Sequence, residues 1–336
     1  MSVHARAQRG IALVTAVMIV AIVAAVAAKI AFAHQIWFRQ MENVADRGAT
    51  DLLRRGALHW ASVALLEDAA QNSIDHLGEP WAMGLPTLPV DGGAIKVSVE
   101  DAQGRFNLNN LVQNNVKSQP DFDVFARLLV NLKLDPQLAN ALVDWIDADG
   151  NVTSPGGAED VDYLSLKTPY RAANQPLASV DELRLVHGFD FKTVQALLDY
   201  VTVLPPQQGR TAININTAKP VLLAALANLD LTWADRVVER RTEKPLQNVA
   251  DLTPLLPQGF KFPQGFADVK TSFFLIKLET SIGRHQRRTV ALMRRDVNKT
   301  TSTVWHRPEP LIDAITAQSS GGSQSSGASD ENAESR

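Results

Sequence analysis

The chain has 336 residues, of which 45% are hydrophobic, so it is long and apolar enough to form two domains with separate cores. A formal net charge of -3 and a pI near 6.2 provide no overall basic field of the kind that attracts nucleic acids. The absence of cysteine excludes disulfides, thiolate metal sites and cysteine nucleophiles.

An uncharged segment follows a short basic leader at the N-terminus. The leader covers residues 1–10, and apolar residues then run from Ile11 to Ala28. As a helix, about 18 residues cover roughly 27 Å, which is close to the thickness of a bilayer core. We expect a membrane-spanning helix over residues 11–33 with its basic end in the cytoplasm. A cleaved signal peptide ending at Ala31-Phe32-Ala33 is the alternative, but its apolar region is normally only about 7–15 residues long.

The helical pattern continues beyond the apolar segment. Large apolar residues recur at spacings of three and four from Ile36 to about Leu66, with charged residues between them. We therefore expect one nearly continuous helix from Ile11 to about Leu66, whose second half packs on a sheet. Gly48 and Gly56 weaken this helix, because glycine is a poor helix former.

Two groups of strand signals flank a long central region. Residues 95–99 alternate between apolar and polar side chains, and residues 104–107 are expected to form the returning strand of that hairpin. A second hairpin is expected later, with strands over residues 274–282 and 290–292 and a turn at residues 283–285.

The region between these hairpins has a helical pattern from about residue 116 to residue 263. Strands of one antiparallel sheet must be neighbours, so we expect an α+β fold in which a helical domain is inserted into a small antiparallel domain. The predicted α/β domain covers residues 34–112 and 268–312, and the predicted all-helical insertion covers residues 113–267. Residues 313–336 are Ser/Gly-rich and are expected to be a disordered tail.

An acidic loop within the insertion is the candidate binding site. Residues 144–162 contain six acids and no Lys, Arg or His. Carboxylates at this density repel one another unless water or a metal compensates them, and calcium prefers about six to eight oxygen ligands in flexible geometry. The predicted oxygen donors are Asp147, Asp149, Asn151, Glu159, Asp160 and Asp162.

The start of this loop is similar to an EF-hand, but the match does not continue. Asp147, Asp149 and Asn151 have the alternating spacing of an EF-hand. Val152 then stands where that loop needs glycine, and Glu159 falls one residue late. The loop is therefore not an EF-hand, and a solvated acidic loop without metal is the alternative.

Helical hairpins after the acidic loop resemble the helix-hairpin-helix (SAM-like) units of competence DNA receptors, most closely over residues 213–252. Such units bind phosphate through the backbone amides of a glycine-rich turn. The turn here, Asn228–Thr232, has no glycine and places Asp230 where phosphate would lie, so we expect no nucleic-acid binding. A membrane-anchored DNA-binding protein is the alternative function. Walker A, GxGxxG, HExxH and GxSxG patterns are absent, and we expect no enzymatic activity.

The N-terminal junction carries a specific resemblance. Arg9-Gly10-Ile11, followed at once by the apolar segment, resembles the cleavage junction of prepilins, whose fifth mature residue is ordinarily Glu. Here that residue is Thr15. A carboxylate inside a bilayer needs a compensating partner, whereas a threonine hydroxyl can bond to its own helix. We therefore expect that Thr15 allows the subunit to sit where no subunit lies ahead of it.

Lack of this Glu is typical of the K-type minor pseudopilins of type II secretion, and three further stretches resemble that family. They are Asp144-Trp-Ile-Asp147, Gly157-Ala-Glu-Asp160 and residues 169–176. The resemblance covers nearly the whole chain except the tail. It implies a pilin-like fold, calcium in the acidic loop, and a prepilin peptidase that cuts after Gly10 and methylates Ile11.

The resemblance also implies a function and a location. It implies a single-pass protein of the bacterial inner membrane, anchored in the lipid bilayer, with a periplasmic C-terminal domain. Together with I-type and J-type minor pseudopilins, such a protein is expected to form the tip of the pseudopilus and to initiate or cap its assembly. With other type II secretion components it would take part in protein export across the outer membrane.

Overall fold

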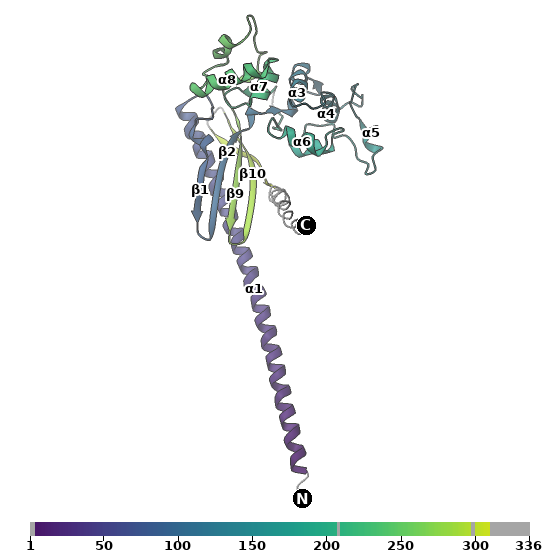
Figure 1. The fold of residues 1–336 in the computed structure, drawn as a ribbon, viewed down its shortest axis with the longest axis vertical. Coiled ribbons are helices and arrows are strands. Elements are labelled where there is room, and N and C mark those ends of the chain that lie inside the picture. The colour runs from purple at the N-terminus through teal and green to yellow at the C-terminus, as the bar shows by residue number, and fades with distance from the viewer. Residues whose placement is uncertain (1–3, 207–208, 297–299, 310–336) are drawn as a thin grey trace, which may run out of the picture.

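The computed structural model describes residues 4–206, 209–296 and 300–309, with side chains described from residue 12 onward. Figure 1 shows a long rod with a small sheet along its upper part and a mainly helical unit beyond the sheet. This arrangement confirms the predicted α+β, pilin-like fold. The predicted tail at residues 313–336 lies outside the described residues.

The rod is helix α1, which runs without a break from His4 to Gln71. It confirms the predicted continuous helix and extends it at both ends. Among the helices that the structure describes, α1 is the one that is both long enough and apolar enough to cross a membrane. Its most apolar stretch has a mean hydropathy of 2.6, and no residue of that stretch is buried. Apolar side chains such as Ile19 and Ile22 are exposed there, which is costly in water and favourable in lipid.

Five antiparallel strands form the main sheet in the order β1-β2-β9-β10-β11. Their bounds are β1 Leu85–Val90, β2 Gly93–Asp101, β9 Phe273–Ile282, β10 His285–Arg295 and β11 Thr301–Glu309. The later hairpin, β9–β10, is confirmed. Strand β1 was not predicted, because Pro86 and Pro89 are more typical of a loop than of a strand. It lies at the edge of the sheet, where prolines are tolerated.

The predicted pairing of residues 104–107 with the first strand is wrong. Phe106 and Asn107 form β3, which pairs in parallel with β6 (Val201–Thr202), and β2 pairs instead with β1 and β9. Short alternating segments look alike in sequence, whereas the true partner of Phe106 comes from a distant part of the chain. Phe106 is buried and stacks on Phe125 of the insertion, so its packing decides its partner.

The sheet and the outer half of α1 share one apolar core. Leu58, Ala61 and Leu65 of α1 are buried against strand residues that include Ile276 and Phe274. The short helix α2 (Pro80–Met83) closes one end of this core, where Trp81 meets Phe274 edge-on at 5.3 Å between ring centroids. The helix is therefore fixed to the sheet by side-chain packing.

The insertion leaves the sheet after β2 and returns before β9. Asp101 and Phe274 are direct partners in that strand pair, so the insertion occupies the tip of a β-hairpin. It is mainly helical, but the expectation of an all-helical unit is corrected by the two-stranded pairs β3–β6, β4–β5 and β7–β8. Its longer elements are α3 Gln119–Asn131, α4 Leu138–Ile146, α5 Asp160–Leu164, α6 Phe191–Leu197, α7 Pro220–Ala227 and α8 Leu231–Glu243, and its short strands are β4 Val112–Gln113, β5 Val116–Lys117, β7 Ile213–Asn214 and β8 Ala267–Asp268. The insertion also contains 3₁₀ segments, which the structure describes at Ala102–Gly104, Leu108–Leu111, Val180–Leu185 and Val249–Leu255.

The insertion has an apolar core of its own, separate from that beneath the sheet. This core includes residues from Phe106 to Val269, beyond the predicted limits of residues 113 and 267, and also Ile74 from the segment after α1. Each unit thus has a core of its own, as expected for two domains in one chain, and a small third cluster packs Leu204 of the insertion with Phe273 and Leu292 of the sheet.

The packing of α1 on the sheet predicts a position-specific loss of stability. Leu65 is fully buried, whereas Val63, two residues away, is 47% exposed. Leu65→Ala should lower the free energy of unfolding by about 2–5 kcal/mol through lost burial and a new cavity. Val63→Ala should change it by less than about 0.5 kcal/mol. Denaturant unfolding of the full chain in detergent measures both, and equal losses would contradict this packing.

Candidate metal-binding site

Two helix ends and a tight turn position the acidic loop. Helix α4 ends just before Asp147, and α5 begins just after Glu159. Between them the chain turns back at Thr153, whose carbonyl accepts a hydrogen bond from the amide of Gly157 at 2.9 Å. A Cβ atom at Gly157 would lie 2.1 Å from Oδ2 of Asp144, so only glycine fits there.

This turn brings three of the predicted ligands together. Asp147, Asp149 and Glu159 each offer a carboxylate oxygen, and these oxygens all lie within 4.8 Å of one another. Asp147 and Glu159 are buried, whereas Asp149 is exposed. A cation bound between them would have protein oxygens on its inner side and access to water on its outer side, which suits the flexible shell of calcium.

The buried carboxylate oxygens at this site have no hydrogen-bond partners. They are Oδ1 of Asp144, Oδ1 of Asp147 and both carboxylate oxygens of Glu159. Buried polar atoms in proteins are nearly always hydrogen-bonded, because an unsatisfied polar atom bears an uncompensated desolvation cost. The residues present therefore fit a bound cation that would satisfy them.

Burial and mutual repulsion shift the acids toward their protonated forms. Burial first, and then the charges of Asp144, Asp147 and Asp149, raise the pKa of Glu159 to about 7. The same two causes raise the pKa of Asp147 to about 6, against a small opposing effect of Lys117. The pKa of Asp144 is also raised, mainly by burial. Without a cation, the site holds protons near neutral pH.

Three predicted donors are directed elsewhere. Asp160 forms an ion pair with Arg171 at 3.0 Å, and the carboxylate of Asp162 accepts from the amide of Glu159 at 3.0 Å. Asn151 is exposed, and its backbone amide donates a hydrogen bond to Oδ1 of Asp149 at 2.8 Å. These residues shape the loop around the acids that face one another.

Asp144 is a member of the site that the sequence reasoning did not include among the ligands. It is fully buried, and its Oδ2 accepts from the amide of Thr153 at 2.9 Å while Oδ1 has no partner. Asp144 lies in the last turn of α4 and Asp147 directly follows the end of that helix, so their separation by only three residues was the available signal.

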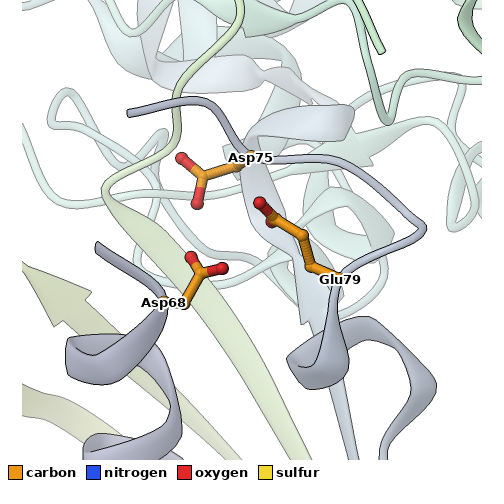
Figure 2. A group of neighbouring side chains, drawn as sticks. All are labelled: Asp68, Asp75 and Glu79. Carbon is orange, nitrogen blue, oxygen red and sulfur yellow. The ribbon is translucent and has the colours of Figure 1, made fainter. Parts of the chain in front are cut away.

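A second group of acids has the same spacing but a different chemistry. Asp68, Asp75 and Glu79 offer oxygens within 4.8 Å of one another near the end of α1, and Figure 2 shows them converging on one space. Here the positive charge comes from a side chain of the protein, Arg295. Arg295 pairs with Asp68 at 3.0 Å and also with Asp75, and Glu79 accepts from the indole of Trp81 at 2.6 Å. These carboxylates have partners, so the acidic loop is the candidate metal site.

The predicted processing and assembly residues lie in the first part of α1. Gly10 and Ile11 are both helical. Thr15 donates its hydroxyl to the carbonyl of Ala12 at 3.0 Å, as expected for a threonine that bonds to its own helix.

The turn that resembles a DNA-binding hairpin is closed by its own carboxylate. Asn228 ends α7 in the left-handed conformation, and Asp230 caps α8 by accepting from the amide of Trp233 at 2.8 Å. The amides that would receive phosphate in a DNA-binding hairpin therefore face an anion of the protein itself.

Comparison with known proteins identifies the class. Two family models described as type II secretion system protein K match residues 104–206 and 213–268, which lie within the insertion. A protein K of Pseudomonas aeruginosa is 33% identical over 302 residues, covering 86% of this chain and 90% of its own length. A protein K of Pectobacterium carotovorum is 34% identical, covering 83% of this chain and 91% of its own length.

A solved structure agrees with these matches. A chain in the crystal structure of the GspK–GspI–GspJ complex from the type 2 secretion system of enterotoxigenic Escherichia coli has a TM-score of 0.67 and 28% identity, covering 77% of this chain and 95% of its own. A long apolar helix, a small antiparallel sheet and a large insertion define a minor pseudopilin. The chain belongs to the type II secretion system protein K family.

Proposed function

We propose that this minor pseudopilin occupies the tip of the type II secretion pseudopilus, where it initiates or caps assembly during protein export across the outer membrane. The placement of the insertion carries the proposal. It lies beyond the end of α1 that is farthest from the N-terminus and extends to one side of the sheet (Figure 1). A subunit ahead of this one in a filament would have to occupy that space. The role is structural and involves no catalysis.

The N-terminal part of α1 supports the same placement. The proposal takes residues 1–10 as a leader that prepilin peptidase removes between Gly10 and Ile11, with methylation of the new amine. The apolar part of α1 would then hold the protein in the inner membrane, with the sheet and insertion in the periplasm. Thr15 bonds within its own helix and needs no terminal amine from a subunit ahead.

The capping proposal predicts that two changes together admit the protein to the filament shaft. The first is Thr15→Glu. The second replaces residues 102–273 by a two-residue Asn-Gly turn, which the direct pairing of Asp101 with Phe274 allows. Immunogold labelling of sheared pseudopili should show the wild type at tips and the double variant along the shaft.

Each single variant is the control for this experiment. Mass spectrometry of every variant should first establish that the mature chain begins at Ile11, so that failure of processing is not read as failure of assembly. A correctly processed double variant that is still confined to tips would contradict the capping role.

An exposed apolar stripe on α1 supports assembly with I-type and J-type partners. Trp37, Met41, Val44 and Leu52 are about 70% exposed and lie on one face of the helix at spacings of three to eight residues. Trp37, Met41 and Val44 line a shallow groove, and Gly48 lies between them and Leu52. A Cβ at Gly48 would meet nothing within 4 Å, so no packing in this chain requires glycine there. We infer that a partner pseudopilin's helix approaches at Gly48.

Substitution at Gly48 should therefore separate stability from assembly. Gly48→Leu should stabilise the isolated chain by up to about 1 kcal/mol, because leucine is the better helix former. The same change should weaken binding to the I-type and J-type partners at least tenfold by blocking the approach of their helices. Arg47→Leu, one residue away on another side of the helix, should leave binding nearly unchanged. Thermal unfolding and detergent pull-down measure the two effects, and unchanged affinity of Gly48→Leu would exclude this interface.

We further propose that the acidic loop binds calcium through Asp144, Asp147, Asp149 and Glu159. The support is the set of buried oxygens without hydrogen-bond partners, with which no basic side chain pairs among the residues that the structure describes. Bound calcium would supply positive charge that stabilises the ionised carboxylates and so fixes the α4–α5 loop. The neighbouring residues Asp160 and Asp162 hold the loop in the required shape.

The calcium proposal predicts opposite effects of one substitution with and without metal. Because the pKa of Glu159 is raised to about 7, the site stabilises the metal-free protein at low pH and loses that contribution as pH rises from about 4.5 through 7. Above pH 7, excess calcium should raise the melting temperature of the wild type. Glu159→Gln should melt higher than wild type in chelator and respond little to calcium, and Asp135→Asn is the exposed control. A wild-type melting curve that calcium leaves unchanged would count against the site.

A further inference from the structure

The insertion is covalently joined to the sheet at two connections, the first after β2 and the second before β9, and non-covalent contacts also hold it there. The segment after α1 reaches across to it, because the amide of Asp75 donates to the carbonyl of Val269 at 2.8 Å and the side chain of Asn214 donates to the carbonyl of Asp75 at 3.0 Å. The amide of Thr271 donates to the carboxylate of Asp75 at 2.7 Å. The segment that directly follows α1 is thus in contact with the base of the insertion.

A buried acid at the connection after β2, Asp101, forms hydrogen bonds to the connection before β9 and to the insertion itself. Asp101, at the end of β2, accepts from the hydroxyls of Thr271 and Thr217, each at 2.6 Å, and from the side chain of Asn214 at 2.8 Å. Gly104 follows closely, and a Cβ there would lie 2.7 Å from the Thr217 hydroxyl oxygen. The two ends of the insertion therefore share one set of hydrogen bonds.

Arg295 joins these contacts to α1. At the end of β10, its guanidinium pairs with Asp68 at 3.0 Å and with Asp75, and donates to the carbonyl of Thr271 at 3.1 Å. We call Asp68, Asp75, Glu79, Asp101 and Arg295 the clasp. Its members come from α1, the segment after α1, β2 and β10, and three of its acids are drawn in Figure 2.

The clasp holds more buried negative charge than positive charge. Its four carboxylates are all buried, and the guanidinium of Arg295, whose side chain is 10% exposed, lies among them. His76 is the other basic group at this place, with its ring nitrogen 3.6 Å from Glu79. Carboxylates that share a site with too few cations cannot all be ionised at low cost, so the closed arrangement favours bound protons.

We propose that the clasp is a proton-operated lock, which holds the insertion against the end of α1 when its acids carry protons and releases the insertion as they ionise. The lock acts on the orientation of the insertion and does not depend on which partners the protein meets. Since the periplasm exchanges small solutes with the surroundings, external pH would set how rigidly the insertion is held.

The pKa shifts give the direction of the effect. Burial, followed by the charge of Glu79, raises the pKa of Asp68 to about 6, and burial raises that of Asp75 to about 6 despite its pairing with Arg295. Opening the clasp to water returns both values toward 3.8 and releases protons. The closed form is therefore favoured in full below about pH 4 and loses that advantage as pH rises through about 6.

Distance measurements between spin labels can test the lock in the full chain. The chain has no cysteine, so labels attach only at introduced sites. Val63→Cys on α1 and Val161→Cys on the insertion are both exposed positions in separate units. With calcium in excess, this pair in detergent should give a narrow distance distribution at pH 5. The released fraction should rise at least tenfold by pH 8, since a shift of about two pKa units corresponds to about 100-fold before screening.

Substitutions distinguish the clasp from other groups that titrate. Asp68→Asn imitates the protonated acid and should give a smaller released fraction than wild type at pH 8, because one acid of the clasp no longer ionises, whereas Asp91→Asn, in the exposed β1–β2 turn, should behave as wild type. A label pair within the insertion, Val130→Cys with Val161→Cys, should show no change with pH.

A distribution between α1 and the insertion that is equally narrow at both pH values would overturn the proposal. So would an Asp68→Asn protein whose insertion is released at pH 8 as readily as that of the wild type. Should Asp68→Asn not fold, hydrogen exchange of residues 267–273 in the wild type gives an independent readout. Their opening constant should rise with a midpoint near pH 6, and a constant that does not change with pH would equally refute the lock.

Discussion

The pairing of β2 with β9 is the constraint on which the rest of the structure depends. Asp101 and Phe274 are partners in one antiparallel ladder, although a whole domain separates them in sequence. The chain must therefore leave and re-enter the sheet at adjacent points, and everything between has to form its own core. The core under the sheet is completed by the buried face of α1, so this helix and the strand pair stabilise each other.

Two groups of buried carboxylates then give this framework its chemistry, and their different partners separate their roles. In the acidic loop, Asp147 and Glu159 have buried oxygens with no hydrogen-bond partner, which is the basis for proposing a cation from solution there. At the base of the insertion, Asp68 and Asp75 surround Arg295, so the protein supplies the cation and protons supply the remaining balance. In both groups, carboxylate oxygens lie within 4.8 Å of one another. This proximity does not by itself distinguish a metal site from an internal ion pair.

Long, periodic elements were predictable because their pattern depends on neighbours in sequence. The apolar run and the spacing after Ile36 predicted α1, and the alternation from Phe274 onward predicted β9 and its turn into β10. Short segments were not predictable in the same way. Phe106 looked like a return strand but pairs with Val201, because burial against the insertion determines its place. In the site, acid density located the loop, yet only the turn at Gly157 decides that Glu159 faces Asp147 while Asp160 turns to Arg171.

The sequence by itself determined the apolar N-terminal segment, the position of Thr15, the α+β class with an inserted domain, and the loop that is rich in acids. These follow from local composition, charge density and periodicity, which do not need distant contacts. Only the tertiary structure decided which carboxylates converge, and it brought Asp144 into the loop site and Arg295 between Asp68 and Asp75. The reason is that burial and distance set the cost of a charge, and both come from residues that the folded chain brings together from far apart in sequence.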